Sequence, residues 1–223
     1  MFASDWFGNE ILIDKVVPVY KCPSSPFDPL LDEDQGAHAT TGAMKHEYVG
    51  IMGAYPDPAG RGSDTCNRAQ LGWICRNGLL LLNETKKMRH ATDGTSHTML
   101  ASEQSGEVDY FKSKKRGWFT VPIRANYAGG WAGAWTDLTA DEVDGVGLFF
   151  HGLTTVMFKL NAPIAVKGFS DDAAYHNTIL NSFHPGVVQV VMADGSARAL
   201  SDALDMETLR RLCSADDGMV FGD

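Results

Sequence analysis

The stretch from Ser182 to Leu200 constrains the fold of this chain more than any other part of the sequence. Residues 187–192 are rich in β-branched side chains, and Asp194-Gly195 is a pair that suits the positive φ angles of tight hairpin turns. We therefore predict an apolar strand, a two-residue turn and a returning strand, preceded by a loop that contains His184 and Gly186.

His184 and Asp194 in this stretch are residue types that often act in catalysis or bind metals, so a catalytic or metal-binding role is considered first. A strand rises about 3.3 Å per residue, so the intervening strand places the two side chains at opposite ends of the hairpin. Asp194 is therefore expected to stabilise the turn by bonding backbone amides. For His184 we expect a neutral imidazole that bonds the backbone of its loop or a neighbouring segment, with a metal-ligand role as the alternative.

Composition and charge limit the classes of function. The 223 residues are long enough for one large domain or two small ones, and their 44% hydrophobic content is enough for a core. We expect a single domain spanning 1–223. The formal net charge of −9 argues against nucleic-acid binding, which depends on clustered Lys and Arg. No stretch approaches the roughly 18 apolar residues that cross a bilayer, so we expect no membrane insertion by the chain as given.

The even number of cysteines fits two disulfides in an oxidising compartment, and four reduced, half-buried thiols are the alternative. The four are Cys22, Cys66, Cys75 and Cys213. Cys66 and Cys75 enclose a short loop and are the preferred disulfide pair. No Cys-x-x-Cys or His-x-x-x-His spacing accompanies this pair, which argues against a zinc site there.

Two acidic loops raise the question of a calcium site. The acidic residues of the first loop are Asp28, Asp32, Glu33 and Asp34, and those of the second are Asp137, Asp141, Glu142 and Asp144. The first loop lacks the alternating Asp order of a helix-loop-helix calcium site, so a solvated loop is favoured. The same two interpretations apply to the second loop.

Aromatic residues occur among many glycines between residues 117 and 150. Trp118, Trp131 and Trp135 are candidates for a glycan platform, because ring faces stack on the apolar faces of sugars. Such rings are more often buried in the core of a β-rich domain, where each covers about 150–250 Å². A carbohydrate-binding surface module, with polysaccharide as its partner, is therefore an alternative function.

Short apolar runs predict four further strands, at residues 16–20, 46–53, 78–82 and 99–103. Near the C-terminus, a helix is expected to begin after an N-cap at Asp202 and to continue through Cys213. Its apolar stripe comprises Leu204, Leu209 and Leu212.

The sequence carries no signature of a known enzyme class. Residue types suited to nucleophilic catalysis occur at Ser96, Ser182, His97, His184, Asp93 and Asp194. There is no Gly-x-Ser-x-Gly elbow, Walker loop, dinucleotide fingerprint or His-Glu-x-x-His motif. We therefore expect a protein without catalytic residues. A secreted hydrolase is the second alternative function, because a Ser-His-Asp constellation can be dispersed along a sequence.

Three blocks, in a consistent order along the chain, carry a family resemblance. They are Cys22-Pro23-Ser24, then Asp93-Gly94-Thr95-Ser96 with its extension to Glu103, and finally His184-Pro185-Gly186 followed by Asp194-Gly195-Ser196 and Arg198. These blocks resemble the CPS, DGTSNT and H-x9-DG motifs of bacterial pseudopilins similar to type II secretion protein G, which are associated with prepilin-type processing. Val187 and His97 depart from the family's usual glycine and asparagine without removing the pattern.

The resemblance implies an α+β fold: a β-rich, pilin-like globular domain with an antiparallel sheet, long loops and a short C-terminal helix. Long insertions are expected at about 54–77 and 104–175. The implied function is that of a non-catalytic structural or assembly protein. The implied location is extracytoplasmic: in the periplasm, on the cell surface or secreted.

Pilin-like subunits, or further copies of the chain itself, are the partners that the resemblance implies. Structural calcium is also expected from the family, but no ligand positions can be assigned and the metal stays unknown. Family members begin with a prepilin peptide and a long apolar helix, and the sequence given contains neither. We therefore expect either the soluble portion of a longer protein or a shortened relative.

Overall fold

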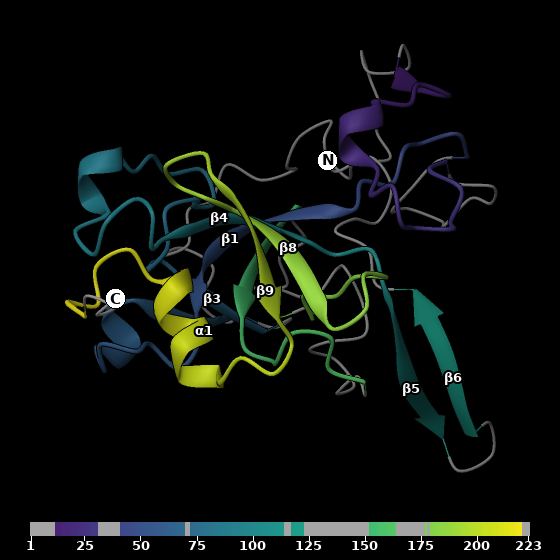
Figure 1. Cartoon of the computed structure of the whole chain (residues 1–223). Coiled ribbons are helices and arrows are strands. Elements are labelled where there is room, and N and C mark those ends of the chain that lie inside the picture. Colours follow the sequence, from purple (N-terminus) through teal and green to yellow (C-terminus); the bar gives the residue numbers. More distant parts are fainter. Residues whose placement is uncertain are drawn as a thin grey trace.

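The structure is a computed structural model of the chain. It describes residues 12–30, 41–69, 72–113, 117–122, 152–163, 177 and 179–219, with only the backbone described within 108–113 and 117–122. The described residues form a five-stranded sheet, two separate hairpins and one α-helix (Figure 1). Within these residues, no helix has the length and apolar character needed to cross a bilayer.

The central sheet has the strand order β7-β1-β4-β8-β9. Its strands are β1 (Tyr48–Ala54), β4 (Met99–Glu103), β7 (Leu153–Val156), β8 (Val187–Met192) and β9 (Ala197–Ser201). β1 pairs antiparallel with β4 and parallel with β7, and the pairs β4–β8 and β8–β9 are antiparallel. The α+β class is therefore confirmed, with one parallel pair in a sheet expected to be antiparallel.

Two hairpins lie outside the central sheet. β2 (Cys66–Ala69) pairs with β3 (Gly72–Cys75), and β5 (Glu107–Ser113) pairs with β6 (Gly117–Pro122). Figure 1 shows β5 and β6 extending away from the central sheet. The expected insertions at 54–77 and 104–175 contain these hairpins, and the second also contributes β7 to the central sheet. Three short 3-10 helices complete the described elements: η2 (Pro18–Tyr20), η4 (Gly62–Asp64) and η5 (Met88–His90).

The main core lies between α1 (Met206–Cys213) and one face of the central sheet. Alternating residues of β8 are buried in this core, namely Val188, Val190 and Met192. The helix contributes its own buried residues, namely Leu209, Leu212 and Cys213. Because α1 also contacts β1 and β4, it packs over the middle strands of the sheet (Figure 1).

The N-cap predicted at Asp202 is wrong, because the helix begins later. Asp205 is the N-cap: its carboxylate accepts hydrogen bonds from Thr208 N (2.9 Å) and Thr208 Oγ1 (2.6 Å). Asp202 instead donates its backbone N–H to Gly186 O (3.0 Å), which fastens the end of β9 to the loop before β8. The predicted end of the helix at Cys213 is confirmed.

The hairpin predicted within residues 182–200 is confirmed as β8 and β9. Val187 pairs with Ser201 at its open end. In the turn, Asp194 Oδ1 accepts hydrogen bonds from Ser196 Oγ (2.7 Å) and Ser196 N (2.9 Å), and these bonds lower the pKa of the Asp194 carboxyl. Asp194 therefore has the predicted turn role, and it lies at the opposite end of β8 from His184.

Two of the predicted strands are wrong. Residues 18–20 form η2, because Pro18 lacks a backbone donor and its fixed φ suits the first position of a helical turn. In 78–82, only Leu80 makes an isolated bridge, and Leu79 and Leu82 are buried in two different apolar clusters. The predictions at 46–53 and 99–103 correspond to β1 and β4.

The predicted Cys66–Cys75 disulfide is confirmed, and it joins residues directly opposite each other in β2 and β3. A second disulfide between the other two cysteines is not formed. Cys22 and Cys213 are both free and buried. Their surroundings differ, since Cys22 Sγ contacts Glu103 whereas Cys213 Sγ contacts the Met99 sulfur in the core.

Reduction of the Cys66–Cys75 bridge is expected to lower the melting temperature, because opening a loop of this size costs roughly 2–3 kcal/mol by the chain-entropy relation. Thermal unfolding with and without a reductant measures the shift. A variant with Cys66→Ala and Cys75→Ala should melt like the reduced protein and be insensitive to reductant. Labelling of all four cysteines in the native, unreduced protein would contradict this assignment.

Candidate functional site

Four side chains from three distant segments meet at one end of the central sheet. Cys22 and Ser24 belong to the loop after η2. Glu103 is the last residue of β4, and His184 lies in the loop before β8. Because β4 pairs antiparallel with β8, the end of β4 lies beside the start of β8. We call these four residues the Cys22 cluster.

The Cys22-Pro23-Ser24 segment forms a turn that directs two side chains toward one point. Ser25 N donates to Cys22 O (3.0 Å), and Pro23 occupies the second position, where its fixed φ is favoured. Glu47, which precedes β1, ties this turn to the sheet. Its buried carboxylate accepts hydrogen bonds from Cys22 N (2.8 Å) and Ser25 Oγ (2.5 Å). Cys22 Sγ and Ser24 Oγ consequently lie 2.9 Å apart.

The loop that carries His184 is a second tight turn. Val187 N donates to His184 O (3.4 Å), and Gly186 adopts a φ of 72°, which a residue with a Cβ would disfavour. The ring of Phe183 packs edge-on against the ring of Phe27, with centroids 5.4 Å apart. This aromatic contact holds the two turns next to each other.

The polar atoms of the Cys22 cluster are in direct contact. Cys22 Sγ lies 3.0 Å from Glu103 Oε1 and 3.8 Å from His184 Nε2. His184 Nε2 lies 3.3 Å from Glu103 Oε1 and 3.3 Å from Ser24 Oγ. Within the described parts of the chain, the Cys22, Glu103 and His184 side chains are the one group of His, Cys, Asp or Glu that could share a metal ion.

The cluster is buried except at its histidine. Cys22 is 0% exposed and Glu103 is 1% exposed, whereas the His184 side chain is 33% exposed. Glu103 Oε2 accepts a hydrogen bond from Gln189 N in β8 (2.8 Å), which orients the carboxylate. The cluster can therefore be reached from solvent at His184, whose Nε2 lies 3.3 Å from Glu103 Oε1.

Tyr48 lies beside the cluster, because it pairs with Glu103 across β1 and β4. Burial raises the pKa of the Tyr48 phenol to about 12. Three acidic groups shift it in the same direction, because negative charge opposes formation of a phenolate: Cys22, Glu103 and Glu47. The Tyr48 phenol beside the cluster therefore stays protonated at neutral pH.

The geometry of the Cys22 cluster differs from that of a catalytic triad. In a triad, the nucleophile contacts one ring nitrogen of the histidine and the carboxylate contacts the other. Here Ser24 Oγ and Glu103 Oε1 both contact Nε2 of His184, and no carboxylate among the described residues contacts Nδ1. The arrangement converges on one point, as ligands of an ion do, and does not form a proton relay.

The family model described as "Protein of unknown function (DUF1559)" matches residues 2–207, which include the whole Cys22 cluster. This chain belongs to the DUF1559 family. No curated protein and no solved structure gives a significant match to this DUF1559 protein. The family match does not test the resemblance to pseudopilins, which stays a prediction.

Other predicted motif residues of the DUF1559 protein meet at the opposite end of β8. Asp194 N donates to Thr95 O (3.1 Å), so the two Asp-Gly turns lie side by side. The Asp93 carboxylate accepts hydrogen bonds from Asp217 N (2.6 Å) and Gly218 N (3.0 Å). These contacts fasten the C-terminal segment to the sheet and give this end a structural role.

The remaining motif residues have local roles. Gly94 and Gly195 occupy turn positions with positive φ. Ser96 Oγ lies 3.2 Å from the Nδ1 of its neighbour His97, and Arg198 is exposed on β9. The side chains considered for a hydrolase therefore do not assemble as a set. Ser182 Oγ accepts a hydrogen bond from the backbone N of His184 (3.1 Å), and the serine whose hydroxyl lies beside the His184 ring is Ser24.

Most of the candidates for glycan and calcium binding lie outside the described residues of the DUF1559 protein. They are Trp131, Trp135, Asp32, Glu33, Asp34, Asp137, Asp141, Glu142 and Asp144. Trp118 lies in β6, where only the backbone is described. The Asp28 carboxylate accepts a hydrogen bond from Leu30 N (2.8 Å), as in a turn.

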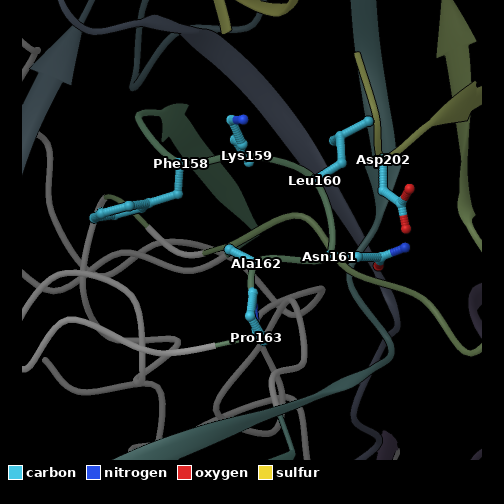
Figure 2. Close-up of a pocket in the computed structure, with 7 residues that line it drawn as sticks. All are labelled: Phe158, Lys159, Leu160, Asn161, Ala162, Pro163 and Asp202. Carbon is cyan, nitrogen blue, oxygen red and sulfur yellow. The ribbon is translucent and has the colours of Figure 1, made fainter. Parts of the chain in front are cut away.

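A pocket of about 410 Å³ lies elsewhere, beside the segment that follows β7. Its lining residues are Phe158, Lys159, Leu160, Asn161, Ala162, Pro163 and Asp202 (Figure 2). Figure 2 shows Asn161 and Asp202 together on one side and Phe158 on the other. No residue of the Cys22 cluster lines this pocket, and the lining gathers no nucleophile with a base.

Sequence reasoning does not identify Glu47 or Glu103 as site residues. Glu103 attracts attention only as the end of the second motif block, and Glu47 lies in no block. A signal for Glu103 exists in the predicted strand at 99–103: if it pairs antiparallel with the strand after His184, the two side chains meet. No comparable signal exists for Glu47, because its role depends on where the first turn docks.

Proposed function

We propose that this DUF1559 protein is a non-catalytic structural or assembly protein that acts outside the cytoplasm. In this proposal it is a pseudopilin-like subunit or a surface-displayed domain. The observation that carries the proposal is the meeting of all three motif blocks around one buried junction, the Cys22 cluster. The residues of the Cys22 cluster hold the loop after η2, the end of β4 and the loop before β8 together. None of them lines the pocket beside β7.

Two further features support the proposal. The Cys66–Cys75 disulfide is compatible with an oxidising, extracytoplasmic compartment, where such bonds persist. The shared contact of Ser24 and Glu103 with one nitrogen of His184 argues against general-base catalysis by that histidine. The pseudopilin-like role itself rests on the resemblance of the three blocks in sequence.

Location and assembly are tested in the source cells. Antibody detection after cell fractionation is expected to find the protein in the periplasmic, surface or secreted fraction, cross-linked to pilin-like subunits or to itself. Exclusive recovery from the cytoplasm would contradict the proposed location. Recovery outside the cytoplasm with no cross-linked partner would contradict the assembly role.

The hydrolase alternative is tested with the purified chain. A broad screen of ester, peptide and glycoside substrates is expected to show no turnover, and His184→Ala is expected to lower only the melting temperature. Turnover that disappears in His184→Ala, with folding intact by circular dichroism, would refute the non-catalytic proposal. Intrinsic-fluorescence titration with polysaccharides tests the glycan alternative, which predicts a saturable shift.

A further inference from the structure

We propose that the Cys22 cluster binds one transition-metal ion, with Zn²⁺ preferred. The ligand atoms are Cys22 Sγ, Glu103 Oε1 and His184 Nε2, which lie within 4.8 Å of one another. The proposal goes beyond the structural function above, and it holds whether or not the protein assembles with pilin-like partners.

The spacing of the three ligand atoms fits a tetrahedral ion. Bonds of about 2.3 Å to sulfur and about 2.0–2.1 Å to nitrogen and oxygen place the ligand atoms roughly 3.3–3.6 Å apart around zinc. The corresponding distances are 3.0 Å for Sγ–Oε1, 3.8 Å for Sγ–Nε2 and 3.3 Å for Nε2–Oε1. To complete the geometry, Sγ and Oε1 would have to move apart by roughly half an ångström, while the other two distances need smaller adjustments.

Ser24 lies beside the fourth position. Its Oγ is 2.9 Å from Cys22 Sγ and 3.3 Å from His184 Nε2, in the same range as the distances among the three ligands. A water held by this hydroxyl, or the hydroxyl itself, would complete four-coordination. Cys22 and Glu103 are buried and the His184 side chain is 33% exposed, so the ion would have three protein ligands and a fourth position taken by water or by the Ser24 hydroxyl.

The chemistry of the donors selects among metals. A thiolate and an imidazole are ligands that zinc binds well, whereas calcium and magnesium prefer sites made only of oxygen atoms. The donor set of one sulfur, one nitrogen and one carboxylate oxygen therefore predicts Zn²⁺ over Ca²⁺. The calcium expected from the family resemblance would have to bind elsewhere.

Supporting contacts already orient the ligands. Gln189 N holds Glu103 Oε2 and so leaves Oε1 facing the sulfur and the imidazole. Glu47 holds the backbone N–H of Cys22 and fixes the position of its thiol. Hydrogen bonds of this kind raise metal affinity by fixing the orientation of each ligand before the ion binds.

Binding would release a proton. Zn²⁺ bonds to the thiolate, so the Cys22 S–H bond breaks and its proton passes to solvent, and no electron is transferred. The bound ion would join the first loop, the end of β4 and the loop before β8, so metal removal should lower the melting temperature.

The test uses the purified full chain, stripped of metal with a chelator and then titrated with Zn²⁺ in competition with a chromogenic zinc indicator. We expect one equivalent bound per chain, a rise in melting temperature and no displacement by millimolar Ca²⁺. With Co²⁺ in place of Zn²⁺, we expect a sulfur-to-cobalt charge-transfer band in the near ultraviolet, which reports ligation by a thiolate.

Matched variants locate the site. Cys22→Ser and His184→Gln are each expected to weaken Zn²⁺ binding by at least about 100-fold. Loss of a residue that only supports a ligand typically weakens metal binding by about 10- to 100-fold, so loss of a ligand should weaken it more. Cys22→Ser should also abolish the charge-transfer band. The controls are Cys213→Ala, which removes the other free thiol, and His90→Gln, which removes an exposed histidine. Both should retain one equivalent and the band.

Several results would overturn the proposal. They are a titration in which wild type and Cys22→Ser bind equally, a cobalt band that survives Cys22→Ser, or displacement of zinc by calcium. His184→Gln distinguishes loss of binding from loss of folding. The His184 side chain is partly exposed, so the variant is expected to fold, and circular dichroism checks that it does. A folded His184→Gln protein with unchanged affinity would also refute the site. None of these outcomes depends on the location or assembly of the protein.

Discussion

Replacing Asp57 with alanine is expected to lower the free energy of unfolding by about 2–4 kcal/mol. The Asp57 side chain is fully buried and accepts hydrogen bonds from Arg61 Nε (2.7 Å) and Nη2 (3.1 Å). It also accepts one from Asn77 Nδ2 (3.0 Å), and Asn77 bonds both backbone polar atoms of Ala54 at the end of β1. The Arg61 side chain is 28% exposed and retains Asp216, which moderates the loss.

Urea unfolding of the two proteins measures this difference. The matched control is Asp64→Ala, which removes an exposed carboxylate from the same loop and should change stability by less than about 0.5 kcal/mol. Equal effects of the two substitutions would show that the buried network around Asp57 contributes nothing beyond a surface charge.

The same residue predicts a dependence of stability on pH. Burial opposes ionisation of Asp57, but hydrogen bonds from Arg61, Asn77 and others outweigh it and hold the pKa of the carboxyl well below its usual range. A carboxyl whose folded pKa is depressed contributes stability above its unfolded pKa of about 3.9, and this stability is lost as the pH falls toward the folded pKa. Stability should therefore fall below about pH 4. Asp57→Asn should show a shallower fall when urea midpoints are compared between neutral and acid pH.

Replacing Gly78 with alanine is expected to cost about 3 kcal/mol or more, or to prevent folding. A Cβ at this position would lie 2.5 Å from Met52 O, 2.6 Å from Met52 C and 2.8 Å from Gly53 N. These are backbone atoms of β1, a strand of the central sheet, so they cannot turn aside as the end of a side chain would. Gly78 N also donates to Met52 O (2.7 Å), a hydrogen bond that the displaced backbone would lose.

Thermal and urea unfolding test this prediction against Gly60→Ala. Gly60 has a φ of 71° but no heavy atom within 4 Å of an added Cβ, so its substitution should cost only the strain of a left-handed residue, about 1–2 kcal/mol. If Gly78→Ala were no worse than Gly60→Ala, the close approach of the 78 backbone to β1 would not be a stability determinant.

Local sequence was sufficient for the elements whose cause is local. The β8–β9 hairpin follows from β-branched alternation and an Asp-Gly turn, and both act between near neighbours in the chain. The Cys66–Cys75 pair follows from a short loop. The end of α1 follows from its apolar stripe, whereas its beginning depended on which of two nearby aspartates, Asp202 or Asp205, reached a free backbone amide.

Long-range packing decided what local patterns could not. Residues 16–20 and 78–82 have apolar runs like those of β1 and β4, but a strand also needs a partner strand. Packing gave 78–82 only the isolated Leu80 bridge, and residues 18–20 became η2. The parallel β1–β7 pair joins segments about a hundred residues apart, and no local pattern specifies that pairing.

The Cys22 cluster shows the same division most clearly. Sequence motifs single out Cys22, Ser24 and His184, and spacing correctly separates His184 from Asp194. The tertiary structure alone places Cys22 and Glu103 around the histidine, because their meeting depends on the β4–β8 register and on the docking of the first turn by Glu47. The ligand set is drawn from the loop after η2, the end of β4 and the loop before β8. These segments have no fixed spacing in sequence, so only the folded chain defines the set.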